Sequence, residues 1–123
     1  MPRPAFLLAE VEPEDGISTR KLVLETAKFN VITAHSTKEA LELLQLHPKV
    51  DAVILHASLA AFDCDVIVAA VRKQQPKIPI IMLAASPGFR CPGADHHLTS
   101  HEPEQLLDLL RSLFGDPRAK PAA

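Results

Sequence analysis

The chain has 123 residues, of which 47% are hydrophobic and 23% charged, and its formal net charge is −2. A chain of this length forms one domain with a substantial core. The near-neutral charge argues against a nucleic-acid-binding surface, and no apolar run approaches the roughly 18 residues that a membrane span needs. With no signal-peptide pattern either, we expect a cytoplasmic domain that binds neither nucleic acid nor membrane.

The two cysteines, Cys64 and Cys91, are too few and too widely spaced to indicate a disulfide framework or a zinc site. In a cytoplasmic protein the simplest expectation is two unpaired thiols.

Short apolar stretches, several of them rich in β-branched residues, predict strands. The third of them contains the fully apolar run Val53 to Leu55, which fits a central strand covered on both faces. The predicted strands lie within Ala5–Ala9, Asn30–Ala34, Val50–Ser58, Ile78–Ala84 and Ala94–Leu98.

Helical patterns follow these strands. Ser36 and Glu39 form a capping box at the start of the second helix, and Pro103 suits the first position of the last helix, which Gly115 ends. The predicted helices are Asp15–Lys28, with acids in its first turn, the segment from Ser36 to before Pro48, Ala60–Gln74, and Glu102–Phe114. Predicted inward side chains include Ile17, Val23, Leu24, Ala27, Leu44, Leu46, Val66, Ile67 and Val71.

Alternating strands and helices indicate an α/β domain with a doubly wound parallel sheet. The stretch Ser86 to Gly93 holds two prolines and two glycines, so we expect no regular helix there. We expect the domain to span residues 1–115 and residues 116–123 to form a flexible tail.

In an open parallel sheet, chemistry lies beyond the carboxyl ends of the strands. Glu10 follows the first strand and His56 ends the third. No serine lies in a nucleophile-elbow motif, so we expect neither an enzyme nor a bound cofactor.

Four stretches, FLLAEVEP, DAVILHASLAAFDC, IPIIMLAAS and GADHHLTS, occur in this order at suitable spacing. Together they resemble a response-regulator receiver domain, the flavodoxin-like phosphoacceptor of bacterial two-component (phosphorelay) signalling, from Ala5 to Phe114. The resemblance implies five parallel strands in the order 2-1-3-4-5, with the fourth helix shortened or missing in this chain.

The resemblance also implies a phosphoacceptor site from which this chain departs. In the family an acidic pair ends strand one, but here it falls on Glu10 and Val11. The phosphoacceptor aspartate falls on His56, the strand-four hydroxyl on Ala84, and the lysine after strand five on Ser100. Acceptor, counter-charge and most of the Mg²⁺ ligands are thereby lost, so we expect a degenerate pseudo-receiver that is not phosphorylated.

Two alternatives stay open. Glu10, His56 and His101 could form a ligand set for a transition metal or a small ligand, although His56 filling the space of the lost aspartate is the simpler interpretation, with no metal bound. An atypical phosphoreceiver is the second alternative.

Loss of the fourth helix predicts a protein-binding surface. We expect Ile80, Met82 or Leu98 to be incompletely covered, and such apolar surface is typical of partner sites. Phosphorylation-independent interaction, with another protein or in a homodimer, would use this strand four and strand five region and the last helix. The residues expected to take part are Pro87, Phe89, His97 and Leu98.

Overall fold

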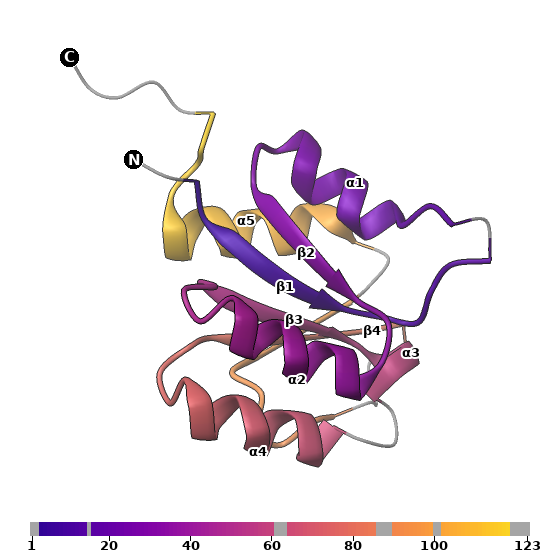
Figure 1. Cartoon of the computed structure of the whole chain (residues 1–123). Helices are drawn as coiled ribbons and strands as arrows, with labels where there is room; N and C mark the ends of the chain where they lie inside the picture. The colour runs from indigo at the N-terminus through magenta and orange to yellow at the C-terminus, as the bar shows by residue number, and fades with distance from the viewer. Residues whose placement is uncertain (1–2, 15, 61–63, 86–89, 100–101, 119–123) are drawn as a thin grey trace.

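A five-stranded, all-parallel sheet in the order β2-β1-β3-β4-β5 forms the middle layer of the computed structural model (Figure 1). This confirms the predicted doubly wound sheet. The strands are β1 (Ala5–Ala9), β2 (Asn30–Ala34), β3 (Ala52–His56), β4 (Ile80–Ala84) and β5 (His96–Thr99). The structure describes residues 3–14, 16–60, 64–85, 90–99 and 102–118.

Helices cover both faces of the sheet. In Figure 1, α1 and α5 lie on one face, and α2 and α4 lie on the other. The helices are α1 (Thr19–Thr26), α2 (Thr37–Leu46), the short α3 (Ala57–Ala60), α4 (Cys64–Gln74) and α5 (Pro103–Phe114).

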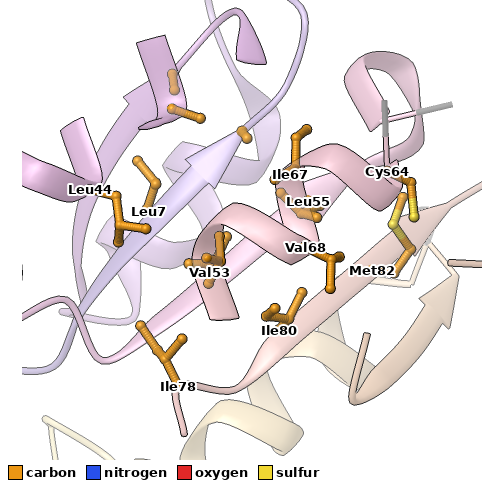
Figure 2. Close-up of a cluster of buried hydrophobic side chains, with 14 of the residues drawn as sticks. Leu7, Leu44, Val53, Leu55, Cys64, Ile67, Val68, Ile78, Ile80 and Met82 are labelled. Carbon is orange, nitrogen blue, oxygen red and sulfur yellow. The ribbon is translucent and has the colours of Figure 1, made fainter. Parts of the chain in front are cut away.

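β1 and β4 are apolar throughout and β3 is apolar up to Leu55, because both faces of these strands are buried. In β3, Ile54 faces the α1/α5 layer, while Val53 and Leu55 face the α2/α4 layer. Figure 2 shows the hydrophobic cluster of the α2/α4 layer, in which Met82 of β4 lies near Cys64, the first residue of α4.

The first helix begins later than predicted. Ser18 is its N-cap and its hydroxyl accepts a hydrogen bond from the Lys21 N–H, so α1 starts at Thr19 instead of Asp15 and has no acid in its first turn. Ile17 therefore precedes the helix and is 58% exposed, so the prediction that it faces inward was wrong.

Two other predictions of inward-facing residues were wrong. The apolar residues of α2 and of α4 extend over a wider part of each helix surface than the part that is buried. Leu46 at the end of α2 is 72% exposed, and Val66 in the first turn of α4 is 58% exposed.

The predicted capping box is present. The Ser36 hydroxyl accepts a hydrogen bond from the Glu39 N–H. The Glu39 carboxylate accepts one from the His35 N–H, one residue earlier than in the usual box.

The connection between β4 and β5 has no helix in its described residues, 85 and 90–95. Ile80 and Met82 are nevertheless buried, at 0% and 1% exposure, so the prediction that they are incompletely covered was wrong for both. Cys91, itself 0% exposed, joins the same hydrophobic cluster and supplies part of the missing cover. Leu98 is half-buried.

Within the described ranges, no helix is both long and apolar enough to cross a membrane.

Candidate functional site

The sheet register brings the ends of β1, β3 and β4 together at one edge. Ala9 pairs with Leu55, so Glu10 emerges beside His56, and His56 itself pairs with Leu83, one residue before Ala84. Of the residues predicted for this edge, Ser100 and His101 lie outside the described residues.

Glu10 is a fully buried carboxylate with two internal partners. Its Oε2 lies 2.5 Å from Arg20 Nε, and its Oε1 accepts a hydrogen bond from the Ser18 hydroxyl. Glu10 is 0% exposed and the Arg20 side chain 29%, so a mostly buried guanidinium balances a fully buried negative charge. Because α1 begins at Thr19, Arg20 lies in its first turn, beside the end of β1.

Val11 occupies the second position of the expected acidic pair, and its side chain is 48% exposed. Its N–H donates a 3.3 Å hydrogen bond to the Ser58 hydroxyl. An exposed isopropyl group here contributes no ligand to a cation.

His56 is held by the turn that follows it. Its Nδ1 accepts a 3.0 Å hydrogen bond from the Ser58 N–H and lies 2.8 Å from the Ser58 hydroxyl oxygen. In the neutral ring, a proton then lies on Nε2. Since the same hydroxyl accepts from the Val11 N–H, Ser58 connects the ends of β1 and β3.

The metal alternative has weak support among these contacts. Both carboxylate oxygens of Glu10 are engaged by Arg20 and Ser18. Across the part of the chain that the structure describes, no group of three His, Cys, Asp or Glu side chains is placed to hold a metal ion. The set that includes His101 extends beyond these residues.

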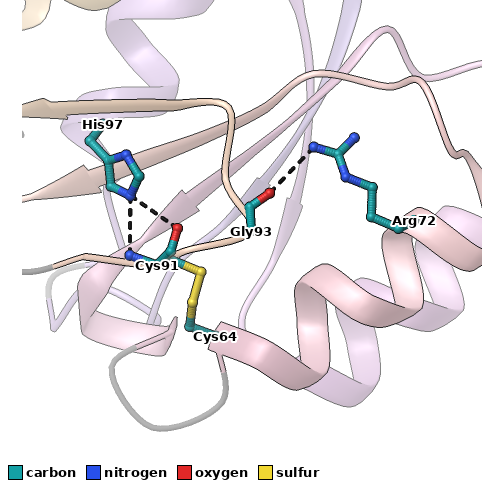
Figure 3. Close-up of a disulfide and its surroundings, with 5 residues drawn as sticks. All are labelled: Cys64, Arg72, Cys91, Gly93 and His97. Atoms are coloured by element: carbon teal, nitrogen blue, oxygen red, sulfur yellow. Dashed lines mark hydrogen bonds between the residues drawn. A yellow bond between two sulfur atoms is a disulfide. The ribbon is translucent and has the colours of Figure 1, made fainter.

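A second group of contacts lies at the connection between β4 and β5. Cys64, the first residue of α4, is disulfide-bonded to Cys91, with a Cα–Cα distance of 6.0 Å (Figure 3). The prediction of two unpaired thiols was therefore wrong. Both cysteines lie on the α2/α4 face of the sheet, and the non-helical described residues 90–95 bring Cys91 to α4.

Of the predicted interaction residues, His97 and Leu98 are half-buried in β5, while Pro87 and Phe89 lie outside the described residues. His97 Nε2 lies 3.1 Å from the Cys91 nitrogen and 3.0 Å from the Cys91 oxygen (Figure 3). The Nε2 atom either accepts a hydrogen bond from the Cys91 N–H or donates one to the Cys91 carbonyl oxygen. His97 therefore holds the Cys91 backbone in either tautomer.

An ion pair holds the far end of this connection. Arg72 Nη2 of α4 lies 2.6 Å from Asp95 Oδ2, which also accepts a 2.7 Å hydrogen bond from the Ile80 N–H. Partial burial alone would raise the pKa of Asp95, but the hydrogen bonds from Arg72 and Ile80, with nearby positive charge, hold it below its ordinary 3.8.

Sequence reasoning missed Arg20, the cystine and the Arg72–Asp95 pair. The cystine had a usable signal: Cys64 lies in the helix that follows strand three, and Cys91 lies before strand five. Because crossover connections between parallel strands are right-handed, both segments lie on one face of the sheet. The partners of Arg20 and Arg72 had no such signal, because flexible side chains choose among several nearby carboxylates.

Comparisons with known proteins agree with this architecture. No protein-family model and no curated protein matches the sequence. Solved structures do: chemotaxis protein CheY4 of Vibrio cholerae superposes with a TM-score of 0.74 at 26% identity, covering 92% of this chain and 100% of that one. A putative response regulator from Chloroflexus aurantiacus gives 0.71 at 26% identity, covering 90% and 98%.

A CheY-like receiver domain from Methanospirillum hungatei gives a higher TM-score, 0.76, at only 16% identity, covering 91% of this chain and 94% of that one. The backbone is thus shared where the sequence is not. Over nearly all of its length, this chain has the fold of the CheY-like response-regulator receiver domains.

Proposed function

We propose that this chain is a degenerate receiver module of a bacterial two-component system, acting in the cytoplasm through phosphorylation-independent binding of another protein or of a second copy. It would be a signalling module and not an enzyme. The fold supports the signalling context, since the similar solved structures include response regulators and a chemotaxis protein. Fold alone is a weak argument for function, so the proposal depends on the site.

One observation carries the proposal: the Glu10 carboxylate is used internally. In a phosphoryl-transfer site, Mg²⁺ held by oxygen ligands neutralises the charge that develops on the phosphoryl group. Here the Arg20 guanidinium already neutralises the carboxylate, and the Ser18 hydroxyl occupies its second oxygen. A cation would have to displace both contacts of a side chain that is 0% exposed.

The neighbouring positions support the same conclusion. His56 offers an imidazole where the family resemblance implies an aspartate, and a histidine cannot form an acyl phosphate. Ala84 is buried at 7% exposure and has no hydroxyl to bind a phosphoryl oxygen. Each loss removes a different part of the reaction.

A phosphoryl mimic tests this directly. We expect the backbone NMR shifts of His56, Ser58 and Ala85 to stay unchanged when beryllofluoride and Mg²⁺ are added. TrrA of Thermotoga maritima, which was crystallised in complex with Mg²⁺-BeF, is the positive control. Saturable shifts in this chain would contradict the proposal and favour an atypical phosphoreceiver.

A reconstruction series identifies which loss matters. Val11→Asp combined with His56→Asp restores two acidic positions but leaves the Glu10–Arg20 pair in place. We expect this variant to bind beryllofluoride weakly, and Arg20→Met added to it to strengthen binding by about tenfold or more, because the freed carboxylate can then hold Mg²⁺. Equal binding with and without Arg20 would show that the ion pair does not block the site.

The binding surface proposed here consists of β5 and the exposed part of α5. β5 is an edge strand with half-buried side chains, so one row of its backbone groups has no partner strand within the sheet. On α5, Leu113 is 42% exposed. An open strand edge can pair with a strand of another chain, and an exposed leucine on α5 offers apolar surface to bury.

Leu113→Glu is the matching test. If the chain self-associates through α5, sedimentation equilibrium should show that self-association of this variant is weaker by about tenfold or more, because the substitution buries a charge at the interface. Leu46→Glu is the control, since Leu46 is 72% exposed on α2, on the other face of the sheet. Equal effects of the two substitutions, or a partner bound equally by both variants, would exclude α5 as the interface.

A further inference from the structure

We propose that Cys64 and Cys91 form a reversible thiol–disulfide pair that exchanges with cellular thiols, and that its state controls how firmly residues 90–95 are held over β4. The inference rests on the proposed function, because it concerns the regulation of the same β4–β5 region. In a cytoplasmic protein, a disulfide is more often a redox sensor than a permanent structural element.

The disulfide holds the described part of the β4–β5 connection against α4. Where the receiver resemblance implies a fourth helix over β4, the described residues provide Cys91, which packs with Met82 in the hydrophobic cluster beside α4. Cys91 is 0% exposed, and its sulfur is bonded to the first residue of α4 (Figures 2 and 3). Breaking this bond removes the covalent link between Cys91 and the first residue of α4.

The domain has enough other contacts to stay folded when the bond is broken. The sheet ladders and the helices on both faces do not depend on it. The connection also keeps the Arg72–Asp95 ion pair at its far end and the His97 contact with the Cys91 backbone. Reduction therefore loosens one segment without unfolding the sheet.

The position of Cys64 suits exchange. It is the less buried cysteine, 8% exposed against 0% for Cys91, so an incoming thiolate reaches it first. It is also the first residue of the 11-residue helix α4, where the partial positive charge of the helix end favours a thiolate and the neighbouring Asp65 opposes one.

The exchange balances with glutathione as the co-reactant. A glutathione thiolate attacks Cys64 Sγ, forms a mixed disulfide there and releases Cys91 as a thiolate, which takes up a proton. A second glutathione thiolate then attacks the glutathione sulfur of the mixed disulfide. Cys64 leaves as a thiolate and is protonated, so the protein disulfide is reduced to two thiols and glutathione is oxidised to its disulfide.

The test is a redox titration of the full chain. Samples are equilibrated in buffers of defined glutathione to glutathione-disulfide ratio, then alkylated under acid quench and analysed by mass spectrometry. We expect a reversible transition within the range of cytoplasmic glutathione ratios, with far-UV circular dichroism unchanged. Reduction that occurs only in denaturant, or that abolishes the dichroism signal, would overturn the proposal and identify a purely structural disulfide.

Hydrogen exchange provides the second measurement. On reduction, we expect the Ala94 amide, which donates to the Cys91 carbonyl, to exchange about tenfold faster or more, while amides of β1 and β3 stay within about twofold. A Cys64→Ala/Cys91→Ala variant should match the reduced protein and ignore the buffer ratio. Equal protection of Ala94 in both states would contradict the loosening. Neither measurement involves a phosphodonor or a partner, so the redox inference and the proposed function fail separately.

Discussion

The end of β1 and β3 and the connection between β4 and β5 both depart from the receiver pattern, but in different ways. At the first, where the receiver resemblance implies a cation site, Glu10 and Ser58 make internal contacts. At the second, where it implies a helix, the described residues 85 and 90–95 contain none and are held by a disulfide and an ion pair.

The comparison shows that a buried charge and an uncovered strand are stabilised by different kinds of contact. A buried carboxylate needs a counter-charge within hydrogen-bond distance, because an unpaired buried charge is very costly. An uncovered strand needs apolar cover, which Cys91 provides only when something holds the connection in place. The contacts of Glu10 are electrostatic and local, whereas the cover over β4 depends on a covalent bond between residues 27 apart in sequence.

The largest expected effect comes from removing the counter-charge of the buried Glu10 carboxylate. Arg20→Met leaves Glu10 buried without its counter-charge, and should lower the free energy of unfolding by about 3 kcal/mol, near the lower end for a buried pair because Arg20 is partly exposed. Urea denaturation measures this. Adding Glu10→Gln to the variant should recover much of the loss, and a double variant as unstable as Arg20→Met alone would show that charge is not the cause.

A smaller effect comes from disturbing the cover over β4. A Cβ added at Gly93 would lie 2.4 Å from Val68 Cγ1 of α4, so Gly93→Ala should cost about 2 kcal/mol through overpacking. Thermal or urea unfolding checks the value. Because Val68→Ala removes the clashing methyl groups, the double variant should be more stable than the sum of the two changes predicts; strict additivity would mean that the two residues do not meet.

The smallest expected effect concerns the ion pair of the connection and depends on pH. Because the folded-state pKa of Asp95 is lowered from 3.8, its stabilisation is present above that value and is lost as the pH falls through the folded-state pKa. With a side chain 42% exposed, Asp95 should contribute less than about 1 kcal/mol. As the pH is lowered through the acidic range, the urea midpoint should fall less steeply for Asp95→Asn than for the natural chain. An unchanged slope would contradict this assignment.

The fold was predictable because its signals are local. Apolar runs such as Ala52–Leu55 of β3 need cover on both faces, and the Ser36 cap fixes the start of α2 from side-chain chemistry alone. The start of α1 was misplaced because Ser18, whose hydroxyl caps the helix, was overlooked as an N-cap.

The site was predictable in position but not in its contacts. The ends of the strands placed Glu10 and His56 at one edge, as the register confirms. The Arg20 partner depends on where α1 begins, and the Cys64–Cys91 bond depends on how two distant segments approach in space. Such pairings follow from tertiary geometry, which residue spacing alone does not supply.

The most direct measurement is phosphoryl uptake by the intact chain. The protein is incubated with acetyl phosphate and Mg²⁺, and its mass is recorded without acid treatment, beside the His56→Ala variant. With Glu10 engaged by Arg20 and an imidazole at the end of β3, we predict no gain of a phosphoryl group in either protein. A gain in the natural chain that disappears in His56→Ala would contradict the account.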